Sequence, residues 1–136
     1  MQICFPYLCD TEGSVLNIGS IGGTTGQHSL GSYAVTKEAI RTITRVAARE
    51  WGPNKINVNV LCPVCYTDTM DQMMEKNGVP KDMRVAALGH VGFKGGVLGM
   101  GTSEDVAPVA AFLISDDARC VTGQTIHADG GQDIHA

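Results

Sequence analysis

The stretch Gly13-Ser-Val-Leu-Asn-Ile-Gly-Ser20 predicts a short buried strand, because its apolar residues lie between two glycines. A loop rich in glycine and threonine is expected next, over residues 22–26. Helical periodicity then runs from about Ser32 to Trp51, where Gly52-Pro53 ends it. This helix carries an apolar stripe made of Ala39, Ile40, Ile43, Val46 and Ala47.

A second strand follows the helix. Apolar residues alternate with asparagines from Ile56 to Val60, and the strand ends at Pro63. Strand, helix and strand in this order predict two parallel strands joined by a right-handed crossover. Ligands of such sheets bind beyond the carboxyl ends of the strands, so we expect Ser20 and the loop after Pro63 to lie at the ligand-binding edge.

The last third of the chain predicts two more elements and a lid. Thr102-Ser-Glu-Asp105 resembles a capping box that opens a helix to about Ile114, and a short strand is expected at Thr125 to Ala128. The glycine- and methionine-rich segment Thr67 to Met100 is predicted to be a mobile helical lid over an apolar ligand, or else a gap-filling pair of surface helices. The fold class is therefore α/β, with a parallel sheet and flanking helices.

Composition narrows the possible partners and location. The chain has 136 residues, which suffices for one domain, and ten basic against fourteen acidic residues give a net charge of -4. No cluster of lysine or arginine and no long apolar run is present, so neither nucleic acid nor a membrane is an expected partner. Five cysteines without a recognisable signal peptide favour reduced thiols, and we expect a cytoplasmic protein.

Three residues have a spacing suited to proton transfer. Tyr33 and Lys37 are one helical turn apart, so their side chains share a helix face, and Ser20 ends the preceding strand. A free tyrosine ionises at a pKa of about 10, and a nearby cation favours its phenolate. Lys37 can supply that cation, which would let Tyr33 exchange a proton with a carbonyl or alcohol oxygen while Ser20 holds the same oxygen.

The wider sequence resembles the short-chain dehydrogenase/reductase family over nearly its whole length. The stretches that carry the resemblance are Gly13 to Ser20, Ser32-Tyr-Ala-Val-Thr-Lys37, Ile56 to Pro63, and Val121-Thr-Gly-Gln124 with Asp129-Gly-Gly131. The resemblance implies NAD(P)-dependent reduction of a carbonyl or oxidation of an alcohol in a small-molecule substrate. Tyr33 would be the general acid/base, Ser20 would orient the substrate oxygen, and Lys37 would bind the nicotinamide ribose.

The same resemblance implies a cofactor loop after the second strand. Pro63, Val64, Tyr66 and Thr67 would pass the nicotinamide, together with Tyr33 and Lys37, although family members usually have glycine where this chain has Val64. Thr69 is an alternative to Thr67 for the threonine contact. Nothing in the sequence distinguishes NAD from NADP.

The glycine-rich phosphate-binding turn of the family, G-x-G-x-x-G or T-G-x-x-x-G-x-G, does not occur in the sequence. We therefore expect residues 1–136 to form a single partial Rossmann-like domain, the last three strands with their helices, without the amino-terminal cofactor-binding half. Its first strand should have an open edge, and the isolated chain should be poorly soluble or associate. A homodimer or homotetramer is implied, with contacts through Ser32 to Trp51 and Thr102 to Ala128.

Two other interpretations remain open. The chain could be a catalytically inactive fragment or a structural partner of such an enzyme, which a test of NADH or NADPH binding would distinguish. Cys62-Pro-Val-Cys65 has the spacing of a redox pair or half a metal site, although the cysteines follow a strand and no second ligand pair has matching spacing.

Overall fold

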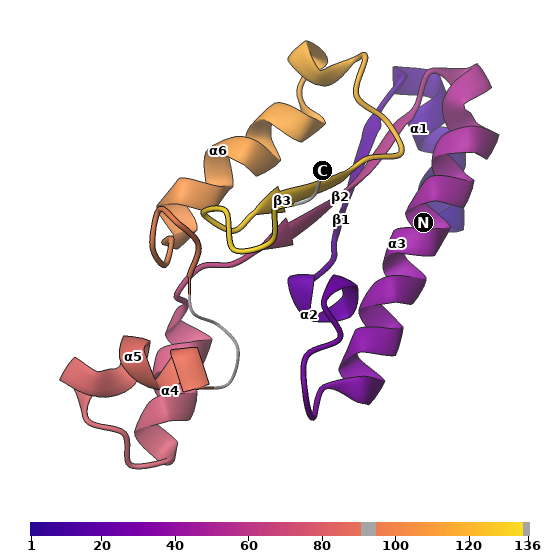
Figure 1. Cartoon of the computed structure of the whole chain (residues 1–136). Coiled ribbons are helices and arrows are strands. Elements are labelled where there is room, and N and C mark those ends of the chain that lie inside the picture. Colours follow the sequence, from indigo (N-terminus) through magenta and orange to yellow (C-terminus); the bar gives the residue numbers. More distant parts are fainter. Residues whose placement is uncertain (91–94, 135–136) are drawn as a thin grey trace.

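Three parallel strands form the centre of the computed structural model, which describes residues 1–90 and 95–134 (Figure 1). The strands are β1 (Ser14–Ile18), β2 (Asn57–Pro63) and β3 (Thr125–Ala128), and they lie side by side in the order β1-β2-β3. Ser14 faces Asn57 across the first pair, and Val60 faces Thr125 across the second. The prediction of an α/β fold with a parallel sheet is confirmed, and the last strand has the predicted bounds.

Helices cover both faces of the sheet. On one side lie α1 (Phe5–Thr11) and the long α3 (Gly31–Trp51), and on the other lies α6 (Ser103–Ile114) (Figure 1). Both crossovers step in the same direction along the sheet, β1 to β2 and β2 to β3, while α3 and α6 lie on opposite faces. The two connections therefore have opposite hands, so only one of them can follow the right-handed rule.

One expected loop contains a helix. Residues 21–24, at the start of the glycine-rich stretch, form the short helix α2 (Ile21–Thr24), because Ser20 caps it and Ile21 is fully buried. Single 3-10 turns occur at Gln2–Cys4, Gly52–Asn54, Lys81–Met83 and Asp116–Ala118. No helix among the described residues combines the length and apolarity that crossing a membrane requires.

The apolar stripe of α3 turns mostly away from the sheet. Ala47 is buried with Ala48 and Trp51, where they meet Ile56 and Val58 of the second strand region. By contrast, Ile43 is 51% exposed and Val46 41% exposed. The inward positions of the first half of the helix are polar instead, and they are Lys37, Glu38, Arg41 and Thr44. The apolar stripe therefore does not identify the face of the helix that packs on the sheet.

The predicted lid consists of two helices that project beyond the carboxyl edge of the sheet (Figure 1). They are α4 (Asp68–Lys76) and α5 (Arg84–His90), while residues 91–94 of the predicted lid lie outside the described residues. The chain returns through residues 95–101 to α6, where the Asp105 carboxylate accepts hydrogen bonds from the backbone N–H of Thr102 (2.8 Å) and from its hydroxyl (2.9 Å). The predicted helix start at Thr102 is therefore confirmed.

Candidate active site

Ser20 lies where β1 ends and α2 begins. Its Oγ accepts a hydrogen bond from the backbone N–H of Gly22 at 3.1 Å, and the residue is buried. A serine hydroxyl has two acceptor lone pairs and one proton, so this bond fixes the oxygen and leaves the proton to donate. The local fold therefore presents an oriented hydrogen-bond donor at the end of the strand.

Burial of the neighbouring residue holds Ser20 in place. Ile21 is fully buried in a cluster with Cys62 and Val64, and Met100 from the far end of the lid packs against it. On the other side of Ser20, the N–H of Gly19 donates to the Leu61 carbonyl at 2.8 Å. The serine is thus fixed from both sides by β2 and the residues that follow it.

Lys37 reaches the same strand end from α3. Its Nζ donates to the Ile18 carbonyl at 3.0 Å and lies 5.6 Å from the centroid of the Tyr33 ring. The second distance is within the range of a cation–π contact. An ammonium group has three N–H donors, so two remain for other ligands. Tyr33 is 42% exposed, which leaves its ring accessible to a small molecule.

These contacts bring Ser20, Tyr33 and Lys37 together around the carboxyl end of β1, the edge where parallel sheets bind ligands. The arrangement contains an oriented hydroxyl, a phenol and a cation. Its chemical capacity is to hold an oxygen atom of a ligand and to exchange a proton with it beside a positive charge.

The residues after β2 belong to two different environments. Pro63 ends the strand opposite Ala128, and the Val64 N–H donates to the Ala128 carbonyl at 2.8 Å. Tyr66 and Thr67, in contrast, form the base of the lid: the Thr67 hydroxyl accepts the Met70 N–H at 3.3 Å and caps α4. The sequence-predicted cofactor residues are therefore divided between the sheet edge and the lid.

A polar network fixes the lid base. The Tyr66 hydroxyl donates to Asp71 Oδ1 at 2.6 Å, and Arg84 Nη1 donates to Asp71 Oδ2 at 2.7 Å. The bond from Tyr66, followed by that from Arg84, holds the pKa of Asp71 below its ordinary value, and the same hydrogen bond to Asp71 raises the pKa of Tyr66. These contacts join the loop after β2 to both lid helices.

A family model matches nearly the whole chain, and this match assigns the chain to a protein family. A family model described as enoyl-(acyl carrier protein) reductase matches residues 1–133. The chain belongs to this family of short-chain dehydrogenases/reductases. A 12alpha-hydroxysteroid dehydrogenase from Clostridium sp. is 36% identical over 133 residues, which are 96% of this chain and 48% of that protein. The chain thus spans about half the length of the curated relatives it matches.

Solved structures agree with this family assignment. The crystal structure of Cj0485 dehydrogenase has a TM-score of 0.84 and 32% identity, covering 95% of this chain and 49% of the other. The structure of ElxO with NADP bound has a TM-score of 0.80 and 26% identity, covering 97% and 51%. The Rossmann-like character of the sheet is therefore shown.

Val64 is accommodated although glycine is usual at this position of short-chain dehydrogenases/reductases. Its side chain is 4% exposed and packs with Ile21 and Cys62. The φ angle of Val64 is not positive, so the backbone has no left-handed conformation that would require glycine there. Valine therefore fills the apolar floor beneath Ser20, and only its backbone is available to a ligand.

The two cysteines of the C-x-x-C motif are not arranged as a reactive pair. Cys62 is fully buried in β2, and burial raises its pKa. Burial and the nearby Asp105 and Glu104 carboxylates raise the pKa of Cys65. Raised values disfavour the thiolate, which is both the redox nucleophile and the metal ligand. Within residues 1–90 and 95–134, no group of three metal-ligating side chains is found.

A polar link between α3 and β3 was missed by sequence reasoning. Arg41 Nη1 lies 2.8 Å from both carboxylate oxygens of Glu38, and its Nε donates to Thr125 Oγ1 at 3.3 Å. The Glu-Arg spacing of three residues was a visible signal for the ion pair. Its contact with Thr125, 84 positions away, was not predictable from spacing.

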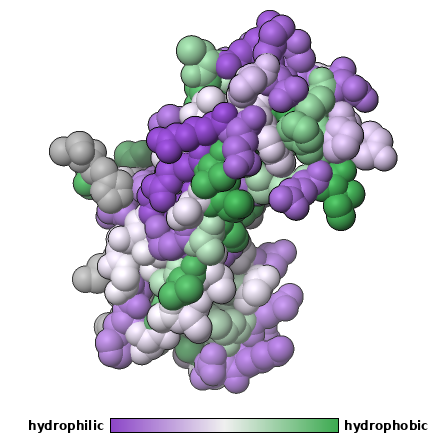
Figure 2. All heavy atoms as spheres, turned by 90° about the vertical axis from the view of Figure 1, so that its right-hand side faces the viewer, coloured by the Kyte–Doolittle hydropathy of each residue, from purple (hydrophilic) through white to green (hydrophobic). Residues whose placement is uncertain are grey.

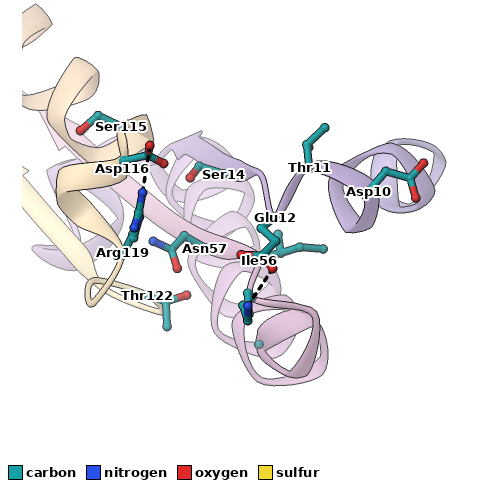
Figure 3. Close-up of a pocket in the computed structure, with 12 residues that line it drawn as sticks. Asp10, Thr11, Glu12, Ser14, Ile56, Asn57, Ser115, Asp116, Arg119 and Thr122 are labelled. Atoms are coloured by element: carbon teal, nitrogen blue, oxygen red, sulfur yellow. Dashed lines mark hydrogen bonds and ion pairs between the residues drawn. The ribbon is translucent and has the colours of Figure 1, made fainter.

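A hollow lies at the end of the sheet opposite to the candidate active site. It has a volume of about 800 Å³ and is lined at the amino ends of β1 and β2 by Ser14 and Asn57, among others (Figure 3). Four charged groups around it form two exposed ion pairs, Lys55 with Glu12 and Arg119 with Asp116. This surface lies at the other end of β1 from Ser20 and so is separate from the candidate active site.

Proposed function

We propose that this chain forms the proton-transfer side of an NAD(P)-dependent oxidoreductase that reduces a carbonyl or oxidises an alcohol. The observation that carries the proposal is the meeting of Ser20, Tyr33 and Lys37 at the carboxyl end of β1. Membership of the short-chain dehydrogenase/reductase family supports it, as does the dehydrogenase activity named for the relatives. The substrate is a small molecule whose reacting group is an oxygen-bearing carbon.

In the reducing direction, Tyr33 donates its phenolic proton to the carbonyl oxygen of the substrate, and in oxidation it takes the proton back. Lys37, with Nζ 5.6 Å from the ring centroid, stabilises the phenolate left behind. Ser20 donates its hydroxyl proton to the same substrate oxygen, because the bond from Gly22 uses one lone pair of the serine oxygen and leaves that proton to donate. The three side chains thus share the work of holding one oxygen and moving one proton.

The residues present fit the nicotinamide end of a dinucleotide. Lys37 has two N–H donors beyond the one bound to Ile18, which suit the hydroxyls of a ribose. We propose that the backbone of Pro63 and Val64 borders the nicotinamide, and that Thr67 donates its hydroxyl proton to the cofactor while capping α4. Tyr66 contributes only acceptor capacity, since its proton is given to Asp71. When bound, the cofactor supplies or accepts the hydride.

We further propose that residues 1–136 are one partial NAD(P)-binding Rossmann-type domain. The relatives are about twice as long, and the glycine-rich phosphate turn is absent from this sequence. Residues outside this chain would then hold the pyrophosphate and determine the choice of NAD or NADP. ElxO, a related structure, has NADP bound, which supports a nicotinamide cofactor of either kind for this family member.

Substitution of Tyr33 tests the proposed function. Tyr33→Phe keeps the ring beside Lys37 and removes the only proton that it could transfer. In the active form, the rate of carbonyl reduction should fall by about 10²-fold or more while NAD(P)H affinity stays within about twofold. Tyr7→Phe is the matched control, because Tyr7 is 74% exposed on α1 and should leave the rate unchanged. A Tyr33→Phe enzyme with the wild-type rate would refute the role of the phenol, and failure to bind either NADH or NADPH would leave only the non-catalytic interpretation.

An exposed apolar face supports self-association. Figure 2 shows apolar side chains gathered on the side of the molecule that carries α1 and α3. The exposed members from α3 are Val35 (71%), Ile43 and Val46, and Ile3 and Tyr7 are exposed near the amino terminus. We propose that this face is the contact of a homodimer or homotetramer. It also supports the second candidate function, a non-catalytic partner that retains the association surface of the enzyme.

We propose a cytoplasmic location for the protein. All five cysteines are free thiols, and Cys4 and Cys120 are exposed. Exposed thiols are retained most readily in a reducing compartment. This observation supports the location without depending on the catalytic proposal.

A further inference from the structure

The end of the chain is hydrogen-bonded to the helix that carries Ser20 at its start. Thr24 Oγ1, at the last position of α2, donates to Asp133 Oδ2 at 3.0 Å across 109 positions of sequence. The pair is partly buried. The helix is only four residues long, so a bond at its end acts within one turn of the Ser20 cap.

The Thr24 proton is available for this bond. Thr24 Oγ1 also lies 2.9 Å from the Ile21 carbonyl, but that carbonyl already accepts the Thr25 hydroxyl at 2.8 Å and the Thr25 N–H at 2.9 Å. A carboxylate is the stronger acceptor for a hydroxyl proton. The single proton of Thr24 is therefore assigned to Asp133.

Asp133 is itself held by a buried turn. Asp129 is 4% exposed, and its carboxylate accepts the N–H of Gly131 and the N–H of Asp133, each at 2.9 Å. Gly130 and Gly131 have φ of 65° and 80°, a conformation that favours glycine. The buried Asp129 carboxylate therefore fixes the backbone N–H of Asp133, and the glycine turn between the two residues sets the path of the chain.

The same turn holds the end of the lid. The Gly130 carbonyl accepts the N–H of Leu98 at 3.0 Å, and a Cβ on Gly96 would overlap Gly130. Residues 96–99 are thus packed against the turn that positions Asp133. One short segment, Asp129 to Ile134, contacts both the helix that follows Ser20 and the far end of the lid.

We propose that Asp133 is a positioning residue for Ser20: through Thr24 it holds α2 in the form that keeps the Gly22 N–H on the serine oxygen. The expected effect on catalysis rests on the proposed function, whereas the expected effect on the Ser20 cap rests on the contacts alone. Because the turn also holds Leu98, the position of the lid end and the orientation of the Ser20 hydroxyl are set by the same turn.

The test compares matched threonine variants in the purified protein. Thr24→Val removes the donor with little change of shape, Thr24→Ser restores it, and Asp133→Ala removes the acceptor. Thr25→Val is the control, because the Thr25 hydroxyl donates to Ile21 and not to Asp133. Amide exchange of Gly22, followed by NMR, reports directly on the Ser20 cap. Steady-state kinetics give kcat and the KM for NAD(P)H separately.

We expect the amide exchange rate of Gly22 to rise about tenfold in Thr24→Val and in Asp133→Ala. The double variant should show no further rise, because both substitutions remove the same hydrogen bond. Where the wild type is active, kcat should fall several-fold with the cofactor KM unchanged, and Thr24→Ser and Thr25→Val should behave as wild type. Unchanged Gly22 exchange would overturn the inference, and so would raised exchange with unchanged kcat. A wild type that is inactive with both NADH and NADPH, in a form that includes the residues proposed to hold the pyrophosphate, refutes the proposed function, and Gly22 exchange then decides on the positioning role by itself.

Discussion

Gly19 is the position where one added carbon should disturb the candidate site most directly. A Cβ built on Gly19 would lie 2.7 Å from Cys62 Sγ and 2.9 Å from Val60 Cγ2. Both neighbours are at most 1% exposed, so neither can swing into solvent. Gly19 also separates Ile18, which accepts the Lys37 ammonium, from Ser20. Relief of the overlap must therefore move the end of β1 away from β2, and two of the three site residues with it.

The magnitude follows from the two contacts. Ordinary carbon contacts are about 3.5–4.0 Å, so the overlap is close to 1 Å on two sides of a packed interior. Insertion of a methyl group into such a core typically costs about 1–3 kcal/mol. For a chain of this size, a loss of about 2 kcal/mol lowers Tm by several degrees. We expect Gly19→Ala to lose about 1–3 kcal/mol of unfolding free energy and, in an active form, to lower kcat.

Denaturant unfolding followed by circular dichroism measures the change. Gly31→Ala is the control, since a Cβ there meets nothing within 4 Å and lies at the start of α3. It should be neutral or stabilising by up to about 1 kcal/mol. Gly19→Ala combined with Cys62→Ala removes the sulfur contact, so the two changes should couple by about 0.5 kcal/mol or more. A Gly19→Ala protein as stable as the wild type would refute the packing argument.

Three further predictions concern pH, thiols and association. Hydrogen bonds lower the pKa of Asp71 and of Asp105, so the two carboxylates stabilise the fold above the ordinary carboxyl pKa of about 3.9, and this stabilisation is lost as the pH falls through their lower folded pKa values. The helical circular dichroism signal should therefore decrease from about pH 4 downward. A signal that stays constant to pH 2 would contradict this. A thiol reagent followed by mass spectrometry should modify Cys4 and Cys120 first and Cys62 only after unfolding, because Cys62 is fully buried with a raised pKa; early labelling of Cys62 would show that β2 opens. The chain should associate in sedimentation experiments, and Ile43→Asp should weaken that association while the control Thr42→Asp should not; a stable wild-type monomer would argue against the proposed face.

The parts of the fold that were predictable depend on local patterns. Alternation predicted β2, and the stretch before Ser20 predicted β1 to within two residues at either end. The capping residues predicted the start of α6. Ser20, Tyr33 and Lys37 were found because a helix and a strand end give fixed directions to side chains separated by few residues. Their catalytic roles remain predictions, as do the cofactor contacts of Pro63, Val64, Tyr66 and Thr67.

The parts that were missed depend on contacts between distant segments. Helix α2 forms in a glycine-rich stretch because Ile21 is buried against β2, which local propensity does not contain. The inward positions in the first half of α3 are polar because Arg41 and Lys37 find partners on β3 and β1. The Asp133 contact with Thr24 spans 109 positions. No periodicity within one element carries information of this kind.

These distant contacts position Lys37 and Ser20 independently of each other. Lys37 is positioned by the Ile18 carbonyl, which is a contact between α3 and β1. Ser20 depends in addition on the floor formed by Cys62 and Val64 and on the turn at Asp129. The lid end touches the same floor through Met100 and the same turn through Leu98. A change in the lid can therefore reach the serine without moving the lysine, so altered lids should affect how the substrate oxygen is held more than how the cofactor ribose is bound.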